Sequence, residues 1–138
     1  MSKPSALIWS GRMFTGLAIL FWVMDGAIKL PPIKPVIDNL HGLGFGITDA
    51  LARGLGLLQL ACLALYVIPR TSLLGAILLT GYLGGAIAIQ IRADNPLFTH
   101  ILFGCYVGII TWVGLLLRDR QARIALFGAQ TGSDGLAA

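Results

Sequence analysis

The sequence predicts an all-α integral membrane protein: an antiparallel four-helix bundle with a short surface helix between its first and second spans. Of the 138 residues, 57% are hydrophobic and only 12% are charged, and the mean hydropathy is +0.84. Soluble domains average about 25% charged residues, so this chain has too little polar surface to coat a globule in water. Four apolar segments, each near the ~20 residues that a helix needs to cross the hydrocarbon core, take up most of its length.

The first span is expected at about residues 8–30. It ends at Pro31-Pro32, because proline cannot continue a helix. The alternative reading of this segment is a secretory signal peptide. That reading is disfavoured because Asp25 and Lys29 would make a poor cleavage region.

A short helix lying on the membrane surface is expected in the connector of residues 33–47. Its apolar residues repeat at helical spacing: Ile33, Val36, Ile37 and Leu40. Glycines at positions 42, 44 and 46 then interrupt the helical pattern before the second span.

The other three spans are expected at about residues 49–68, 73–91 and 97–117. Short turns separate them, so consecutive spans must run antiparallel; Asp94-Asn95-Pro96 is typical of such a turn. All four spans would form a single domain, residues 1–127. The Gly/Ser/Ala-rich residues 128–138 are expected to be a flexible tail.

Positive charge is unequal on the two sides of this topology. Lysines and arginines number six on the side of the termini, at positions 3, 12, 70, 118, 120 and 123, and four on the other, at positions 29, 34, 53 and 92. The positive-inside rule therefore predicts that both termini are cytoplasmic. The net charge of +4 fits anchoring in a lipid bilayer. No basic segment interleaved with aromatic residues suggests nucleic acid as a partner.

Asp25 is the most informative single residue. The chain contains no glutamate, and Asp25 is the only carboxylate well inside a predicted span. Ionisable groups at membrane depth cost at least ~2.5–3.5 kcal/mol on insertion scales, and they usually have a functional role. Asp25 is therefore the candidate catalytic acid or base.

The topology brings further polar residues to the same side of the membrane as Asp25. The candidate ligand-binding residues are Lys29, Arg53, Gln59, Gln90 and Arg92, with His100 nearby at the interface. We expect a polar pocket that opens toward the outer face or the outer leaflet, with Arg53 as the countercharge for Asp25 or Asp49. The structural alternative is an i,i+4 salt bridge between Asp25 and Lys29, cations that reach the headgroups, and glutamines that join helices.

Other site classes find little support. The two histidines and two cysteines have no recognised metal-ligand spacing, so no metal site is expected. Two small-xxx-small pairs, Gly81 with Gly85 and Gly104 with Gly108, predict close helix packing without indicating any chemistry.

Several segments resemble the DoxX-like family of small bacterial membrane proteins. They are LQLACLALYVIPRTSLLGAILLTGYLGGAIAIQIR at 58–92, DGAIKLPP at 25–32, NPLFTHILFG at 95–104 and WVGLLLRD at 112–119. The resemblance covers about residues 12–126 and implies a four-helix bundle in the bacterial inner (plasma) membrane. It also implies a link to quinones, since relatives are named for subunits of a terminal quinol oxidase and of a thiosulfate:quinone oxidoreductase.

Two positions depart from the usual pattern of that family. Gln90 stands where histidine is common and Gln59 where glutamate is common, and both changes replace an ionisable group by a neutral amide. If the family's pocket transfers protons, this chain lacks two of the carriers. The departures therefore favour binding over catalysis.

These observations predict a protein that binds a quinone or similar isoprenoid lipid in an outer-leaflet polar pocket, as an accessory subunit of a membrane oxidoreductase system. No intrinsic cofactor is expected, and the partner is a larger redox complex or a second copy of the chain. One alternative is a lipid- or isoprenoid-modifying enzyme that uses Asp25 as acid or base. The other is a membrane scaffold or chaperone without a small-molecule site.

Overall fold

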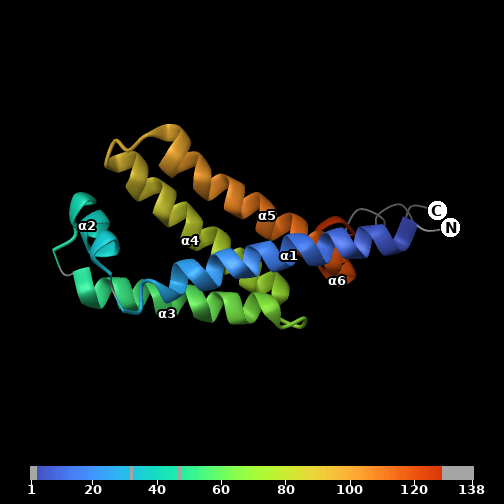
Figure 1. The fold of residues 1–138 in the computed structure, drawn as a ribbon. Helices are drawn as coiled ribbons and strands as arrows, with labels where there is room; N and C mark the ends of the chain where they lie inside the picture. The colour runs from blue at the N-terminus through green and yellow to red at the C-terminus, as the bar shows by residue number, and fades with distance from the viewer. Residues whose placement is uncertain (1–2, 32, 47, 129–138) are drawn as a thin grey trace, which may run out of the picture.

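The computed structural model describes residues 3–31, 33–46 and 48–128, which form a helical bundle (Figure 1). The elements in order are α1 (Lys3–Ala27), α2 (Lys34–Gly42), α3 (Thr48–Val67), α4 (Ser72–Arg92), η1 (Leu97–Ile101), α5 (Leu102–Arg118) and α6 (Arg120–Phe127). Four helical segments in this part of the chain are long and apolar enough to cross a membrane: Ala6–Ala27, Thr48–Val67, Ser72–Arg92 and Leu97–Arg118. The predicted four-helix membrane fold is confirmed.

The four long helices form a closed ring of contacts. Helix α1 packs against α3 and α5, and α4 packs against the same two helices. Only a few residues separate α3 from α4, so these two helices run antiparallel. The predicted short helix between the first two spans is present as α2, which packs on α3 and exposes most of its polar side chains.

Glycines set the close approach of the helices in the half of the bundle nearer the termini. A Cβ atom on Gly75 in α4 would overlap the backbone of Tyr66 in α3, and one on Gly114 in α5 would lie 2.9 Å from the backbone nitrogen of Thr15 in α1. The fully buried side chains of Tyr66, Leu79 and Leu115 fill the core beside these contacts. This half of the bundle is tightly packed.

The other half is more open, because α1 is short at its carboxyl end. The first span was expected to extend to residue 30, but α1 ends at Ala27 and two tight turns follow it. Its end lies beside Gly56, eight residues and about 12 Å inside α3. Figure 1 shows α2 at the end of the bundle that α1 does not reach, with α4 and α5 diverging from α1 and α3.

Two elements were not predicted as separate helices. The fourth span begins with a π-helical turn, η1, in which the backbone N–H of Leu102 bonds to the carbonyl of Leu97, before α5 continues as an α-helix. Helix α6 follows α5 after a single residue, Asp119. Most of the predicted flexible tail, residues 129–138, lies outside the described residues.

Candidate functional site

Lys29 is the centre of a polar cluster that joins three helices. Its ammonium nitrogen lies 2.5 Å from Oδ2 of Asp25, 2.8 Å from Oε1 of Gln59 in α3 and 3.1 Å from the hydroxyl oxygen of Tyr82 in α4. An ammonium group has three N–H donors, and each of them has an acceptor here. The nitrogen also lies 5.4 Å from the centroid of the Tyr82 ring, close enough for a cation–π interaction.

The place of Lys29 depends on close packing between α1 and α3. A Cβ atom on Gly56 would lie 2.9 Å from the Cβ of Lys29 and 3.0 Å from the carbonyl oxygen of Gly26. A Cβ atom on Gly26 would in turn lie 2.8 Å from the Leu60 side chain. These two glycines let the end of α1 lie against α3, and the tight turn after Ala27 then directs the lysine toward Gln59.

Buried hydrogen bonds connect this cluster to the core. Gln59 is fully buried, and its amide nitrogen donates to the backbone carbonyl of Trp22 at 3.1 Å. The indole N–H of Trp22 donates to the hydroxyl of Thr111 in α5 at 3.0 Å, and the hydroxyl of Tyr66 donates to the carbonyl of Thr111 at 2.8 Å. Because buried polar groups are costly when unpaired, these bonds fix how α1, α3 and α5 meet.

A cavity of about 750 Å³ lies beside the cluster, in the open half of the bundle. Asp25, Lys29 and Tyr82 form part of its wall. Apolar residues of all the surrounding helices form most of the remainder, among them Phe21, Ile28, Leu40, Leu51, Leu55 and Val107. Ligand pockets in proteins have volumes of about 300–1,000 Å³ and combine apolar walls with a few placed polar groups. The cavity has both properties.

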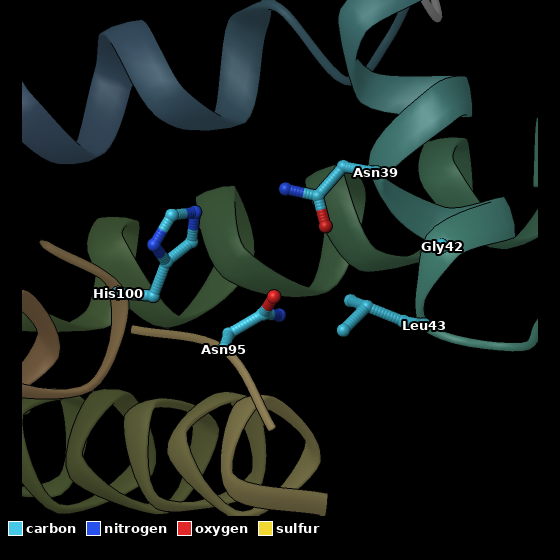
Figure 2. Close-up of a pocket in the computed structure, with 5 residues that line it drawn as sticks. All are labelled: Asn39, Gly42, Leu43, Asn95 and His100. Atoms are coloured by element: carbon cyan, nitrogen blue, oxygen red, sulfur yellow. The ribbon is translucent and has the colours of Figure 1, made fainter. Parts of the chain in front are cut away.

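A smaller pocket of about 230 Å³ lies between α2 and the turn that precedes η1. Figure 2 shows the side chains of Asn39, Asn95 and His100 directed into this space from three segments of the chain. Asn39 and His100 also line the large cavity. The small pocket therefore adjoins the larger one.

The structure brings some of the predicted site residues together and separates others. Asp25, Lys29 and Gln59 are in the cluster, and Gln90, which accepts a hydrogen bond from Asn95, lines the cavity two helical turns beyond Tyr82. Arg53 and Arg92 are exposed and do not line it. The prediction of Arg53 as the countercharge for Asp25 or Asp49 is wrong: Asp25 forms its ion pair with Lys29, and no ion pair of Arg53 occurs among the described residues.

Sequence reasoning gave no polar role to Tyr82, Trp22 or Thr111. None of these three residues was among the predicted site residues. Nothing in the local sequence distinguishes an aromatic residue that hydrogen-bonds to a lysine of another helix from one that packs in the core. Their roles depend on long-range contacts. Tyr82 bonds to a lysine 53 positions away in the sequence, and Trp22 and Thr111 are 89 positions apart.

The two small-xxx-small pairs differ in role. Gly104 packs on α4, because a Cβ atom there would lie 2.9 Å from the Ile87 side chain, and Gly108 faces Leu83. Gly81 and Gly85 have no atom of another segment within 4 Å of a Cβ position, and both line the cavity. The pair in α4 thus leaves space in the bundle instead of closing it.

Comparison with models of known protein families assigns the chain to a family. The model of the DoxX-like family matches residues 13–114, about three quarters of the sequence. The chain belongs to the DoxX-like family. Comparisons with curated proteins and with solved structures give no match. All the polar groups of the cluster and all the described residues that line the cavity lie within the matched region of this DoxX-like protein.

Among the described residues, no group of three or more His, Cys, Asp or Glu side chains is arranged to hold a metal ion. Cys62 is buried and Cys105 is exposed, and both are free thiols. The site as described therefore consists of a charged cluster, amides, an imidazole and an apolar cavity.

Proposed function

We propose that this small integral membrane protein binds an isoprenoid quinone or a similar lipid, with the polar head at the Lys29 cluster and the chain in the apolar part of the cavity. The observation that carries the proposal is the 750 Å³ cavity, which has a buried polar cluster on one wall and apolar side chains on most of the others. A soluble polar metabolite would leave most of this apolar wall unmatched. A lipid with a compact polar head matches both parts.

The lipid chain has a route out of the bundle between α3 and α4. On the opposite side of the cavity, the rings of Phe21 and Phe103 pack edge to face with their centroids 5.4 Å apart, and they join α1 to α5. On α4, Leu83 and Ile87 face α5, so Gly81 and Gly85 lie nearly opposite, away from α5. The two glycines add no side chain to this route, and both are exposed.

The proposed role is that of an accessory subunit in a membrane oxidoreductase system. The polar groups of the site can bind and orient a quinone, and a larger redox complex would supply the electron-transferring cofactor. The orientation proposed for this role has both termini in the cytoplasm of a bacterial inner membrane. The cavity then opens toward the outer leaflet.

A second candidate function is an enzyme that modifies isoprenoid lipids with Asp25 as acid or base. The position of Asp25 on the cavity wall favours it, with Tyr82 held nearby by the same lysine. The completed hydrogen bonding of Lys29 argues for a structural role of that lysine, because all three of its N–H groups are directed to acceptors of the protein itself.

The experiment that tests the proposal is native mass spectrometry with lipid extraction on the gently solubilised protein. The wild type is compared with Asp25→Asn and with Asp38→Asn. Asp38 is a matched control because it also pairs with a lysine four residues away, Lys34 at 3.5 Å, but on the exposed surface of α2. We expect a stoichiometric isoprenoid lipid on the wild type and on Asp38→Asn, and a clearly lower occupancy on Asp25→Asn.

Bulk phospholipid alone on all three proteins would contradict the proposal and favour a scaffold role. Retention of the isoprenoid lipid by Asp25→Asn at the full wild-type occupancy would leave the cavity as the site but remove Asp25 from it. The yield and thermal stability of each variant show whether any loss of lipid reflects unfolding.

A further inference from the structure

The hydrogen-bonding groups that remain free at the cavity wall indicate which head group fits there. We infer that the site selects a lipid whose head carries a hydroxyl over one that offers only carbonyl oxygens, so that it binds a quinol in preference to the corresponding quinone. This inference rests on the proposed function and specifies the redox form of its ligand. It follows from the partners of Lys29, Asp25 and Tyr82.

Lys29 is not available to a ligand. Its three N–H donors are directed to Asp25, Gln59 and Tyr82, from three different helical segments. The side chain of Lys29 is only 17% exposed. A carbonyl oxygen entering the cavity would have to displace one of these acceptors to bond with the ammonium group. Lys29 is the only lysine or arginine among the described residues that line the cavity, and it serves the protein's own polar groups.

Asp25 presents an acceptor to the cavity. Oδ2 binds Lys29, and no donor in the described part of the chain contacts Oδ1. The side chain of Asp25 is 28% exposed and lines the cavity. A carboxylate in an ion pair has only acceptor sites, so a ligand must bring a donor. A hydroxyl brings one, whereas a quinone carbonyl would place its own lone pairs against those of the carboxylate.

Tyr82 supplies the complementary donor. Its oxygen accepts from Lys29 at 3.1 Å, and its own O–H has no acceptor among the residues that the structure describes. A hydroxyl group both donates and accepts. One ligand hydroxyl can therefore donate to Asp25 and accept from Tyr82, because Lys29 holds both side chains at the cavity wall. A carbonyl can use only the second of these contacts.

The size of the preference for quinol depends on the cost of leaving the free carboxylate oxygen of Asp25 without a donor. Sites built around a substrate hydroxyl reject analogues that lack it by up to about 10⁴–10⁵-fold, because buried groups are left unpaired. Asp25 keeps part of its exposure, so water can replace a missing donor in part. We therefore expect the quinol to bind about tenfold more tightly than the quinone.

The test is a competition between decylubiquinone and decylubiquinol under strictly anaerobic conditions. The detergent-solubilised protein is equilibrated with an equimolar mixture and isolated, and the two forms are extracted and quantified by anaerobic chromatography. The ratio on the protein is divided by the ratio in solution. Four proteins are compared: the wild type, Asp25→Asn, Tyr82→Phe and Asp38→Asn.

We expect a roughly tenfold enrichment of quinol on the wild type and on the Asp38→Asn control. Asp25→Asn should lose the preference, because an amide can donate to a carbonyl as well as accept from a hydroxyl. Tyr82→Phe should retain a preference for quinol, since the O–H donor that it lacks and the Lys29 N–H that it frees can each bond to either oxygen. If Asp25→Asn folds poorly, the ratios measured on the wild type and on Tyr82→Phe still test the inference.

The results that would overturn the inference differ from those that would overturn the proposed function. Equal binding of the two forms, or enrichment of quinone, leaves the lipid site intact but overturns the selectivity. A quinol preference that persists in a folded Asp25→Asn protein overturns the assignment to Asp25. If neither form binds the wild type, the proposed function fails and the inference fails with it.

Discussion

Lys29 shows how a charged residue can be retained inside a membrane bundle. Lysines near the end of a span usually extend their side chains to the headgroups. Lys29 instead lies against three polar side chains from α1, α3 and α4. The cost of its burial is offset only while all three contacts are made, since removal of one partner of a buried ion pair is strongly destabilising. The cluster is therefore both a structural tie and the polar wall of the cavity.

Asp119 is the residue for which we predict a pH dependence of stability. Its Oδ1 accepts from the backbone N–H groups of Gln121 and Ala122 at 2.9 and 3.2 Å, which caps α6, and Oδ2 accepts from Ser72 at 2.7 Å. Burial alone would raise the pKa of Asp119, but the hydrogen bonds from Ser72 and the two amides, together with the Arg118 charge, outweigh it. They hold the pKa below its ordinary value.

Because the pKa of Asp119 is lower in the folded than in the unfolded protein, its contribution is complete above the unfolded pKa. It is lost as the pH falls through the folded pKa. We expect Asp119→Ala to cost about 1 kcal/mol at neutral pH, as the loss of a helix cap does, and less in acid. Thermal unfolding in detergent at pH 7 and pH 3, with Asp38→Ala as control, measures this. An equal cost at both pH values would contradict the prediction.

At the scale of helices, glycines have two opposite roles. Gly26, Gly56, Gly75 and Gly114 lie where two helices meet too closely for a side chain. Gly81 and Gly85 lie where α4 borders the cavity and nothing fills the space beside them. Spacing along the sequence does not separate these roles, because both kinds occur in apolar spans. The position of the neighbouring helix separates the two roles.

The open glycines give a prediction about α4. Gly85→Leu would fill the proposed route of the lipid chain, whereas Gly84→Leu places the same side chain on the adjacent residue, which is exposed and does not line the cavity. We expect Gly85→Leu to weaken lipid binding about tenfold, or ~1.4 kcal/mol, within the ~1–3 kcal/mol that overpacking costs. Gly84→Leu should bind normally. Lipid occupancy in native mass spectra measures both, and equal occupancy would remove α4 from the route.

The whole molecule consists of a tightly packed half near the termini and an open half that α2 covers. The difference arises because α1 ends about 12 Å short of the start of α3. Non-helical backbone at membrane depth is tolerated where it is buried in protein or lines a cavity. The turn after Ala27 meets this condition, since Ile28 and Lys29 line the cavity.

The predicted orientation of the molecule can be tested by cysteine labelling. In a background of Cys62→Ala and Cys105→Ala, cysteine replaces either His41 in α2 or Gln121 in α6, both of which are exposed. If the termini are cytoplasmic, a membrane-impermeant maleimide should label His41→Cys in intact cells. Gln121→Cys should react only after the membrane is permeabilised. The opposite pattern would show that the positive-inside rule fails for this chain.

Sequence reasoning located the four spans to within a few residues at most ends, because their hydrophobicity and length are local properties of the chain. It named Arg53 as the countercharge of Asp25 and gave the i,i+4 pair with Lys29, which the structure contains, only as the structural alternative. It did not predict that α1 would end early, at the point where Gly26 lies in close contact with Gly56 of α3. The π-helical start of the fourth span and the separate α6 were missed for the same reason: each depends on geometry at a junction.

The sequence by itself determined that this protein lies in a membrane as four antiparallel helices, and that Asp25 and Lys29 are spaced so that they can meet. These properties follow from hydrophobicity, span length and spacing along one helix. Only the tertiary structure decided that Gln59 and Tyr82 complete the lysine's hydrogen bonds, that Arg53 stays outside, and that a cavity remains beside them. The physical reason is that rotation and end-to-end offset between packed helices decide which side chains meet, and both depend on contacts distant in the sequence.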